Sequence, residues 1–182
     1  MNRLKSVIII LCAALGFASC EKEELDDHTK GNEGNYKPIF SFTLNGERRV
    51  TEDVYVNWVS TTSFEMVATV RDQYSGYNSL EMRIRYSALM MGSYPWVRNL
   101  QSSNLSSTAQ IKLPSQTMVY STDNAPAEVS DAGFASIKRL NYASEYMEGT
   151  FEYTMYAPLA QQSVYTPITV RDGKFYYIGW DQ

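Results

Sequence analysis

The sequence predicts an all-β domain, an antiparallel β-sandwich of about ten short strands. Hydrophobic and polar residues alternate along short segments, the period that places one face of a strand on a core. Turn signals separate these segments at a spacing of roughly 8–12 residues. The 13% aromatic share, rich in Tyr, suits pleated and half-buried surfaces. A partly closed, lipocalin-like β-barrel is the alternative architecture.

The first expected element is a hairpin, IFSFTLNGERRV (39–50), in which Asn45-Gly46 supplies a two-residue turn. The clearest alternation follows in FEMVATVR (64–71) and SLEMRIRYS (79–87). The remaining strands are expected at VYVNWV (54–59), AQIKL (109–113), QTMVYS (116–121), FASIKRL (134–140), YMEGTFEYTMY (146–156), VYTPITVR (164–171) and KFYYIGW (174–180).

Two further signals locate sheet edges and turns. Pro95 lacks a backbone N–H, so any strand within 88–98 belongs at a sheet edge or at a bulge. Asp172-Gly173 predicts a last hairpin turn between the final two strands. Together these elements predict one all-β domain over residues 38–182.

Residues 1–19 are typical of a secretory signal, because MNRLK carries two cations and SVIIILCAALGFA is apolar. The apolar run is shorter than the roughly 20 residues that a membrane-spanning helix needs. Cleavage after Ala18 would leave Cys20 as a lone thiol. Alternatively, FASC resembles a bacterial lipobox, with Phe17 where Leu is usual. Cys20 would then be the first mature residue and would carry acyl chains such as palmitate, which anchor it stably in a membrane.

The segment after the cysteine, residues 20–37, is polar and charged and is expected to be a flexible acidic tether. Its Lys22-Glu23-Glu24 resembles the export tag of Bacteroidota lipoproteins, a lysine followed by two acids. That resemblance implies the outer membrane and its cell-surface side. If the run is only solvated charge, the periplasmic face of the same membrane is the alternative.

Composition excludes several classes of function. The formal charge is −4, and removal of Arg3 and Lys5 with the signal leaves −6, which gives nucleic acid no basic surface. Both cysteines, Cys12 and Cys20, and the single histidine, His28, precede residue 38. The domain is therefore expected to hold no disulfide, no thiolate zinc site and no histidine-based triad. We found no cofactor-binding or metal-binding motif in it.

Two sets of side chains remain as candidates. Carboxylates could form the pair that a hydrolase needs; they are Asp123, Glu128, Asp131, Glu145 and Glu148. Four aromatic residues in predicted loops, Tyr74, Tyr77, Tyr94 and Trp96, are the better candidate ligand surface of the two sets, because exposed rings offer large rigid contact area. The abundance of aromatic residues in sheets favours the other interpretation, that these rings cover the ends of the core.

Several short motifs resemble small uncharacterised lipoproteins of Bacteroidota, known as domains of unknown function. These motifs are FSFTLNGE near the start, GSYPW in the middle, and FASIKRLNYASEYMEGTFEYTMY followed by ITVRDGKFYYI near the end. The resemblance implies an extracytoplasmic all-β lipoprotein and supplies no catalytic residue. Its marked positions are Gly149, Thr150, Phe151, Gly173 and Phe175, for which turns, bulges and the core are sufficient roles.

The sequence thus favours a lipid-anchored, non-enzymatic binding module of the cell envelope, with a glycan or an envelope protein as its partner. Two alternatives stay open at this point. A closed barrel would enclose a small lipophilic ligand, and paired carboxylates in a cleft would indicate a hydrolase.

Overall fold

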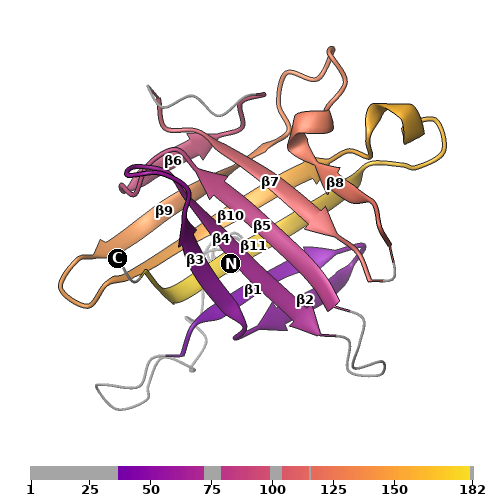
Figure 1. Ribbon diagram of the computed structural model, residues 1–182. Helices are drawn as coiled ribbons and strands as arrows, with labels where there is room; N and C mark the ends of the chain where they lie inside the picture. The colour runs from indigo at the N-terminus through magenta and orange to yellow at the C-terminus, as the bar shows by residue number, and fades with distance from the viewer. Residues whose placement is uncertain (1–36, 72–78, 99–103, 115, 181–182) are drawn as a thin grey trace, which may run out of the picture. The chain divides into compact units, whose positions relative to one another are not determined.

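The computed structural model describes residues 37–71, 79–98, 104–114 and 116–180, which form two antiparallel sheets (Figure 1). These residues contain eleven strands and two short 3-10 helices. The strands are β1 (Ile39–Leu44), β2 (Glu47–Thr51), β3 (Val54–Trp58), β4 (Phe64–Arg71), β5 (Ser79–Tyr86), β6 (Gly92–Pro95), β7 (Ser107–Lys112), β8 (Val119–Ser121), β9 (Gly133–Asn141), β10 (Tyr146–Met155) and β11 (Ile168–Gly179). The 3-10 helices are η2 (Thr122–Asn124) and η3 (Leu159–Gln161).

The six-stranded sheet has the order β2-β1-β11-β10-β9-β6. The predicted hairpin is confirmed, because β1 and β2 turn at Asn45 and Gly46, whose φ angles of 52° and 81° suit a two-residue turn. The longest strand, β11, lies between β1 and β10 and pairs with both. At one edge, β6 ends at Pro95, as its missing N–H requires.

The five-stranded sheet has the order β3-β4-β5-β7-β8. Its two longest strands, β4 and β5, pair without interruption from Phe64–Tyr86 to Arg71–Ser79. Alternate residues of β5, from Leu80 to Tyr86, are buried, so the predicted period of two is confirmed.

The core lies between the two sheets, whose strands cross one another in Figure 1. It is filled by aromatic rings and methionines, with Phe64 stacked on Tyr86 at 4.7 Å and Phe40 stacked on Phe151 at 4.8 Å. Among the described residues, no strand of one sheet forms a continuous ladder with a strand of the other. Two isolated β-bridges, Trp96–Ser107 and Ser121–Tyr156, are the only strand-like pairings between the sheets in this part of the chain. The sheets do not close, so the structure is a sandwich and the barrel alternative is wrong.

Two cross-strand pairs of glycine and phenylalanine join β10 to β11. Gly149 pairs with Phe175, and Phe151 pairs with Gly173. A Cβ on Gly149 would lie 2.4 Å from the Phe175 ring, and one on Gly173 would lie 2.5 Å from the Phe151 ring. Each ring therefore covers the glycine opposite it, which compensates for the missing side chain.

The predicted turn at Asp172-Gly173 is wrong. Both residues lie inside β11, where the pairing with β1 skips from Ser41–Lys174 to Thr43–Arg171. Asp172 does have a positive φ, 51°, but this conformation forms a bulge in a continuous central strand. The strand expected from residue 164 begins only at Ile168.

Candidate ligand-binding site

Tyr94 does not form the exposed surface that the sequence predicted. It is fully buried on the inner side of β6, and its ring meets Tyr86 edge-on at 5.2 Å. Its hydroxyl accepts a hydrogen bond from the Met90 N–H at 3.1 Å and lies 2.6 Å from the Met90 carbonyl oxygen. Burial raises the pKa of this hydroxyl. Alternation along an edge strand, with Pro95 outward, explains why Tyr94 faces the core.

Trp96 is likewise 9% exposed, so its predicted surface role is also wrong. It packs with Ala125 and Ala132 in a small cluster apart from the main core. The Arg98 guanidinium lies 5.5 Å from its ring centroid and donates to the Ala125 and Pro126 carbonyl oxygens. This group of contacts holds the loop after η2 and explains Trp96 as a structural residue.

The other predicted site residues lie outside the described residues. These are the lipid-attachment residue Cys20, the export-tag residues Lys22, Glu23 and Glu24, and the loop tyrosines Tyr74 and Tyr77. Their predicted roles stay predictions.

The candidate carboxylates are spread over several elements. Glu148 of β10 lies 3.7 Å from Arg139, and Asp123 is in η2. Burial raises the pKa of both carboxyls, and the nearby arginines oppose this effect. Among the described residues, no group of three or more metal-ligating side chains occurs.

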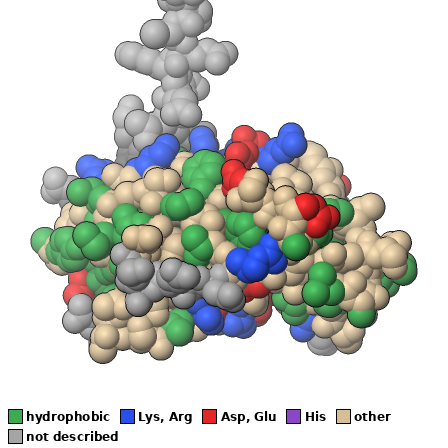
Figure 2. All heavy atoms as spheres, turned by 90° about the horizontal axis from the view of Figure 1, so that it is seen from above, with side chains coloured by type: hydrophobic (Ala, Val, Ile, Leu, Met, Phe, Trp, Pro, Cys, Tyr) green, Lys and Arg blue, Asp and Glu red, His purple; other side chains and the backbone are tan. Residues whose placement is uncertain are grey.

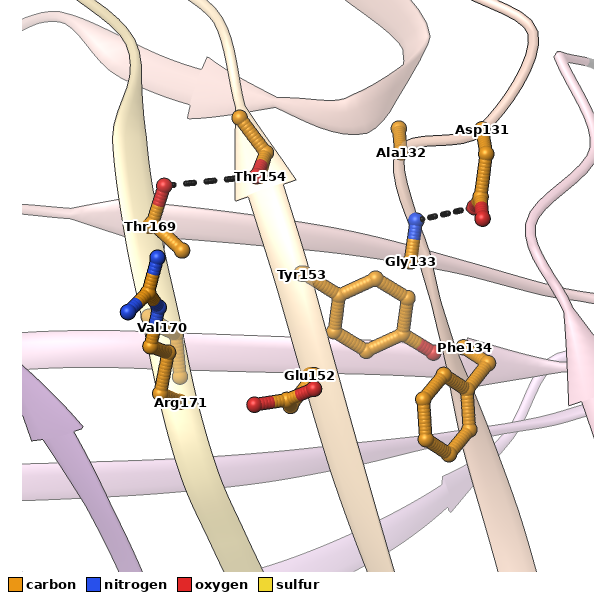
Figure 3. A pocket seen from close by; sticks show the side chains of 10 residues that line it. All are labelled: Asp131, Ala132, Gly133, Phe134, Glu152, Tyr153, Thr154, Thr169, Val170 and Arg171. Atoms are coloured by element: carbon orange, nitrogen blue, oxygen red, sulfur yellow. Dashed lines mark hydrogen bonds between the residues drawn. The ribbon is translucent and has the colours of Figure 1, made fainter.

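An open hollow of about 300 Å³ lies on the outer face of the six-stranded sheet (Figure 3). The ends of β9, β10 and β11 line it, together with the residues just before β9. Alternation turns Tyr153 and Val170, which also line it, inward to the core. The remaining side chains at the hollow are Asp131, Phe134, Glu152, Thr154, Thr169 and Arg171.

Phe134, Glu152 and Arg171 come from three neighbouring strands (Figure 3). Phe134 and Glu152 are directly paired across β9 and β10, and the Phe134 ring is 40% exposed. Arg171 is next to the bulge at Asp172. At this bulge the register passes from Phe151–Gly173 to Tyr153–Val170, so Arg171 and Asp172 lie opposite Glu152. The bulge therefore helps to place a guanidinium beside a carboxylate and an aromatic ring.

The charged groups of the hollow are available to a ligand. Among the described residues, neither the Glu152 side chain nor the Arg171 side chain forms a hydrogen bond or an ion pair. Thr154 and Thr169 are joined at 3.3 Å, and the Asp131 carboxylate accepts from the Gly133 N–H at 2.8 Å (Figure 3). The hollow thus offers donors, acceptors and one exposed ring.

Gly133 brings the start of β9 against β10 at the hollow. Its φ is 119°, and a Cβ there would lie 2.1 Å from the Glu152 carbonyl oxygen. Only glycine permits this approach. The Ala132 carbonyl oxygen then accepts from the Thr154 N–H at 2.9 Å, which fixes the upper rim of the hollow.

A smaller hollow, of about 230 Å³, lies on the five-stranded sheet and has different chemistry. It is lined by Glu81, Arg83, Gln110, Lys112 and Val119, without an aromatic ring. Arg83 is already bonded to Glu81 at 2.7 Å and to Glu65 at 3.1 Å. We therefore regard the Phe134 hollow as the better candidate.

Exposed hydrophobic residues also gather at one end of the molecule. Figure 2 shows them towards the left of the view, the end at which β6 and the β9–β10 turn lie in Figure 1. Met90 and Met91, just before β6, are 55% and 62% exposed, and Tyr142, just after β9, is 68% exposed. This patch lacks the set of convergent polar groups that orients a small ligand in the Phe134 hollow.

The chain was compared with family models, curated proteins and solved structures, and none of them matches it. In the described part of the chain, no helix has the length and apolar character to cross a bilayer. We therefore infer the function from the chemistry of the hollow and from the N-terminal sequence.

Proposed function

We propose that this protein is a lipid-anchored, non-enzymatic envelope protein that binds glycans in the Phe134 hollow. The observation that carries the proposal is an exposed Phe134 ring beside Glu152 and Arg171, two charged side chains without partners among the described residues. An aromatic ring packs on the C–H face of a sugar. Glu152 accepts from sugar hydroxyls and Arg171 donates to them, through charge-assisted hydrogen bonds.

The placement of the perturbed carboxyls supports binding over hydrolysis. A glycoside hydrolase needs a general acid whose pKa is raised, beside a second carboxylate across the scissile bond. Asp123 and Glu148 have raised pKa values, but neither of them lines the hollow. Glu148 instead lies beside Arg139 on a different part of β10.

The test is affinity electrophoresis of the full chain through gels that contain starch, β-glucan, xylan, mannan, alginate or polygalacturonate. We expect retardation by a polysaccharide, and about tenfold weaker binding or more for Phe134→Ala and for Arg171→Ala. Tyr55→Ala and Arg71→Ala are matched controls, because both side chains are exposed on the five-stranded sheet. Equal retardation of all variants, or retardation by none of the polysaccharides, would contradict the proposal.

The anchor is a second part of the proposal and has its own test. The signal, the FASC segment and the resemblance to Bacteroidota lipoproteins support acylation of Cys20, and Lys22-Glu23-Glu24 supports display at the cell surface. We expect protease added to intact cells to cleave the natural protein, and Cys20→Ala to release it from the membrane. A membrane-bound but protected protein would overturn surface display alone. If Cys20→Ala stays membrane-bound, the lipid anchor is wrong.

A further inference from the structure

A strained tyrosine lies on the same strand pair as the hollow. Tyr177 of β11 has a φ of 51°, in the left-handed region that bulky side chains rarely adopt. The register between β10 and β11 shifts here, from Gly149–Phe175 to Met147–Ile178. Two residues of β11, Tyr176 and Tyr177, therefore lie opposite the single residue Glu148 of β10. A bulge of this kind changes the direction in which a side chain points.

The bulge places the Tyr177 ring against Tyr146. The two ring centroids are 5.1 Å apart, with an angle of 56° between the rings. The neighbours Met147 and Ile178 are fully buried, so alternation turns Tyr146 to the outer face of the sheet. Both tyrosines are partly exposed, and neither belongs to the hydrophobic core. The strained backbone thus maintains an aromatic pair outside the core, which packing of the core does not require.

This aromatic pair and the Phe134 hollow share one face of the sheet. From Tyr146 to Glu152 strand β10 rises about 20 Å, at roughly 3.3 Å per residue. Glu148 and Thr150 lie between them on the outward side of β10, and Thr150 pairs with Ser136 of β9 and Lys174 of β11. Carboxylate, hydroxyl and ammonium groups therefore lie between the two aromatic sites.

Charge narrows the class of ligand. Along this face Asp131, Glu148 and Glu152 are matched by Arg139, Arg171 and Lys174, so neither sign of charge is in excess. A uronate-rich chain would gain no net attraction from a face whose acidic and basic groups balance. Neutral sugars, whose hydroxyls both donate and accept hydrogen bonds, fit this set of side chains.

We infer that the outer face of β9, β10 and β11 binds one extended neutral polysaccharide at two subsites, the Phe134 hollow and the Tyr146–Tyr177 pair. The inference rests on the proposed glycan-binding function of the hollow. A disaccharide reaches one subsite only, whereas a chain long enough to cover about 20 Å reaches both. The second contact is then made within one complex, which raises affinity without altering the first contact.

The test measures Kd against chain length by calorimetry, with fractions from the disaccharide to the decasaccharide of starch, β-glucan, xylan and mannan. For the natural full chain we expect affinity to rise about tenfold or more once both subsites are covered. Tyr177→Gly removes the ring and suits the positive φ, and Tyr146→Ala is a second variant. Both should abolish the gain with length and leave disaccharide binding unchanged. Tyr177→Phe should retain the gain, as should Tyr165→Ala, a control ring that is 42% exposed in the β10–β11 loop.

The possible results of the calorimetry distinguish the two-subsite inference, the neutral class of ligand and the glycan-binding proposal. Disaccharide binding without a gain with length, or a gain that survives both Tyr variants, overturns the two-subsite inference and leaves the glycan-binding proposal standing. A gain found only with acidic polysaccharides overturns the neutral class. Absence of binding to every neutral fraction overturns both. If Tyr177 had a structural role alone, Tyr177→Gly would lower the Tm and leave the dependence on chain length intact.

Discussion

The two sheets of this protein differ in the regularity of their strand pairing. Along the five-stranded sheet, the described pairings of β3, β4, β5, β7 and β8 continue without a register shift. In the six-stranded sheet, register shifts interrupt the pairing of β11 with β1, of β10 with β11 and of β10 with β9. The hollow and the Tyr146–Tyr177 pair both lie on the irregular sheet.

Their outer faces also differ in how charges are paired. On the five-stranded sheet, Glu65 lies 3.1 Å from Arg83 and 3.5 Å from Arg85, and its side chain is only 12% exposed. On the six-stranded sheet, Glu152 and Arg171 have no such partners among the described residues. Both faces contain ion pairs, but only the six-stranded sheet places a charged pair, Glu152 and Arg171, beside a bulge without partners among the described residues.

The largest expected effect concerns the close packing of the irregular sheet. Gly149→Ala places a Cβ 2.0 Å from the Ser136 carbonyl oxygen and 2.4 Å from the Phe175 ring. We expect the free energy of unfolding to fall by about 3 kcal/mol or more, because backbone must move. Urea denaturation measures this loss. Gly179→Ala is the control, since its nearest contact is 3.7 Å, and we expect a change within about 0.5 kcal/mol. Equal losses for both variants would contradict the role of Gly149.

The second prediction compares the two acids. Glu65→Ala leaves Arg83 and Arg85 without a shared partner at a half-buried position, so we expect a loss of about 1–3 kcal/mol of stability. Glu152→Ala removes no contact within the described residues, and we expect a change within about 0.5 kcal/mol. Thermal or urea denaturation of both variants measures the two losses of stability. If Glu152→Ala costs as much as Glu65→Ala, the contrast between the two faces is wrong.

A third prediction tests the inner faces of the sheets with two buried hydroxyls. Tyr153 of β10 donates to the Ser107 hydroxyl at 2.6 Å, whereas the buried Tyr86 hydroxyl of β5 has no hydrogen-bond partner in the described structure. We expect Tyr153→Phe to lower the free energy of unfolding by about 1 kcal/mol, and Tyr86→Phe to leave it unchanged or to raise it. Chemical denaturation at one pH compares them. Destabilisation by Tyr86→Phe would show that its hydroxyl has a partner after all.

The smallest expected effect is a dependence on pH at Glu148. Burial raises the pKa of this carboxyl in the folded protein, with Arg139 opposing the shift. Between the unfolded and folded pKa values the folded state binds more protons, so this group's contribution to stability decreases as pH rises. We expect the stability of the natural protein relative to Glu148→Gln to fall by less than about 1 kcal/mol from about pH 4 to 7. An increase over the same range would mean that Arg139 dominates instead.

Much of the fold could be predicted from the sequence because alternation is local. The strand β4 begins and ends at Phe64 and Arg71, as its period of two predicts, and Asn45-Gly46 turns where expected. Asp172-Gly173 was predicted wrongly because positive φ suits a hairpin and a bulge equally well. The bulge is distinguished from the hairpin turn only by the pairing of β11 with β1 and β10 on both sides of Asp172-Gly173.

The candidate site was predictable only in part. Tyr94 and Trp96 were expected at the surface because the segment near Gly92 and Pro95 resembles a loop, yet both rings are buried. A signal for Phe134 did exist, since it shares the outward positions of β9 with Ser136 and Lys138. Its proximity to Glu152 and Arg171 depends on register across three strands, which alternation within one strand does not specify.

The central position of β11 has a consequence for the order of folding. It is the last of the described strands in chain order, yet it pairs with β1, the first of them, and separates β1 from β10. Until β11 has been made and is free to pair, β1 and β10 lack their common partner, and the six-stranded sheet stays incomplete. Closing so long a loop is slow, because its entropy must be lost before the pairing is formed. Pairing of the six-stranded sheet therefore waits for β11, whereas hairpins of neighbouring strands such as β4 and β5 can form before it.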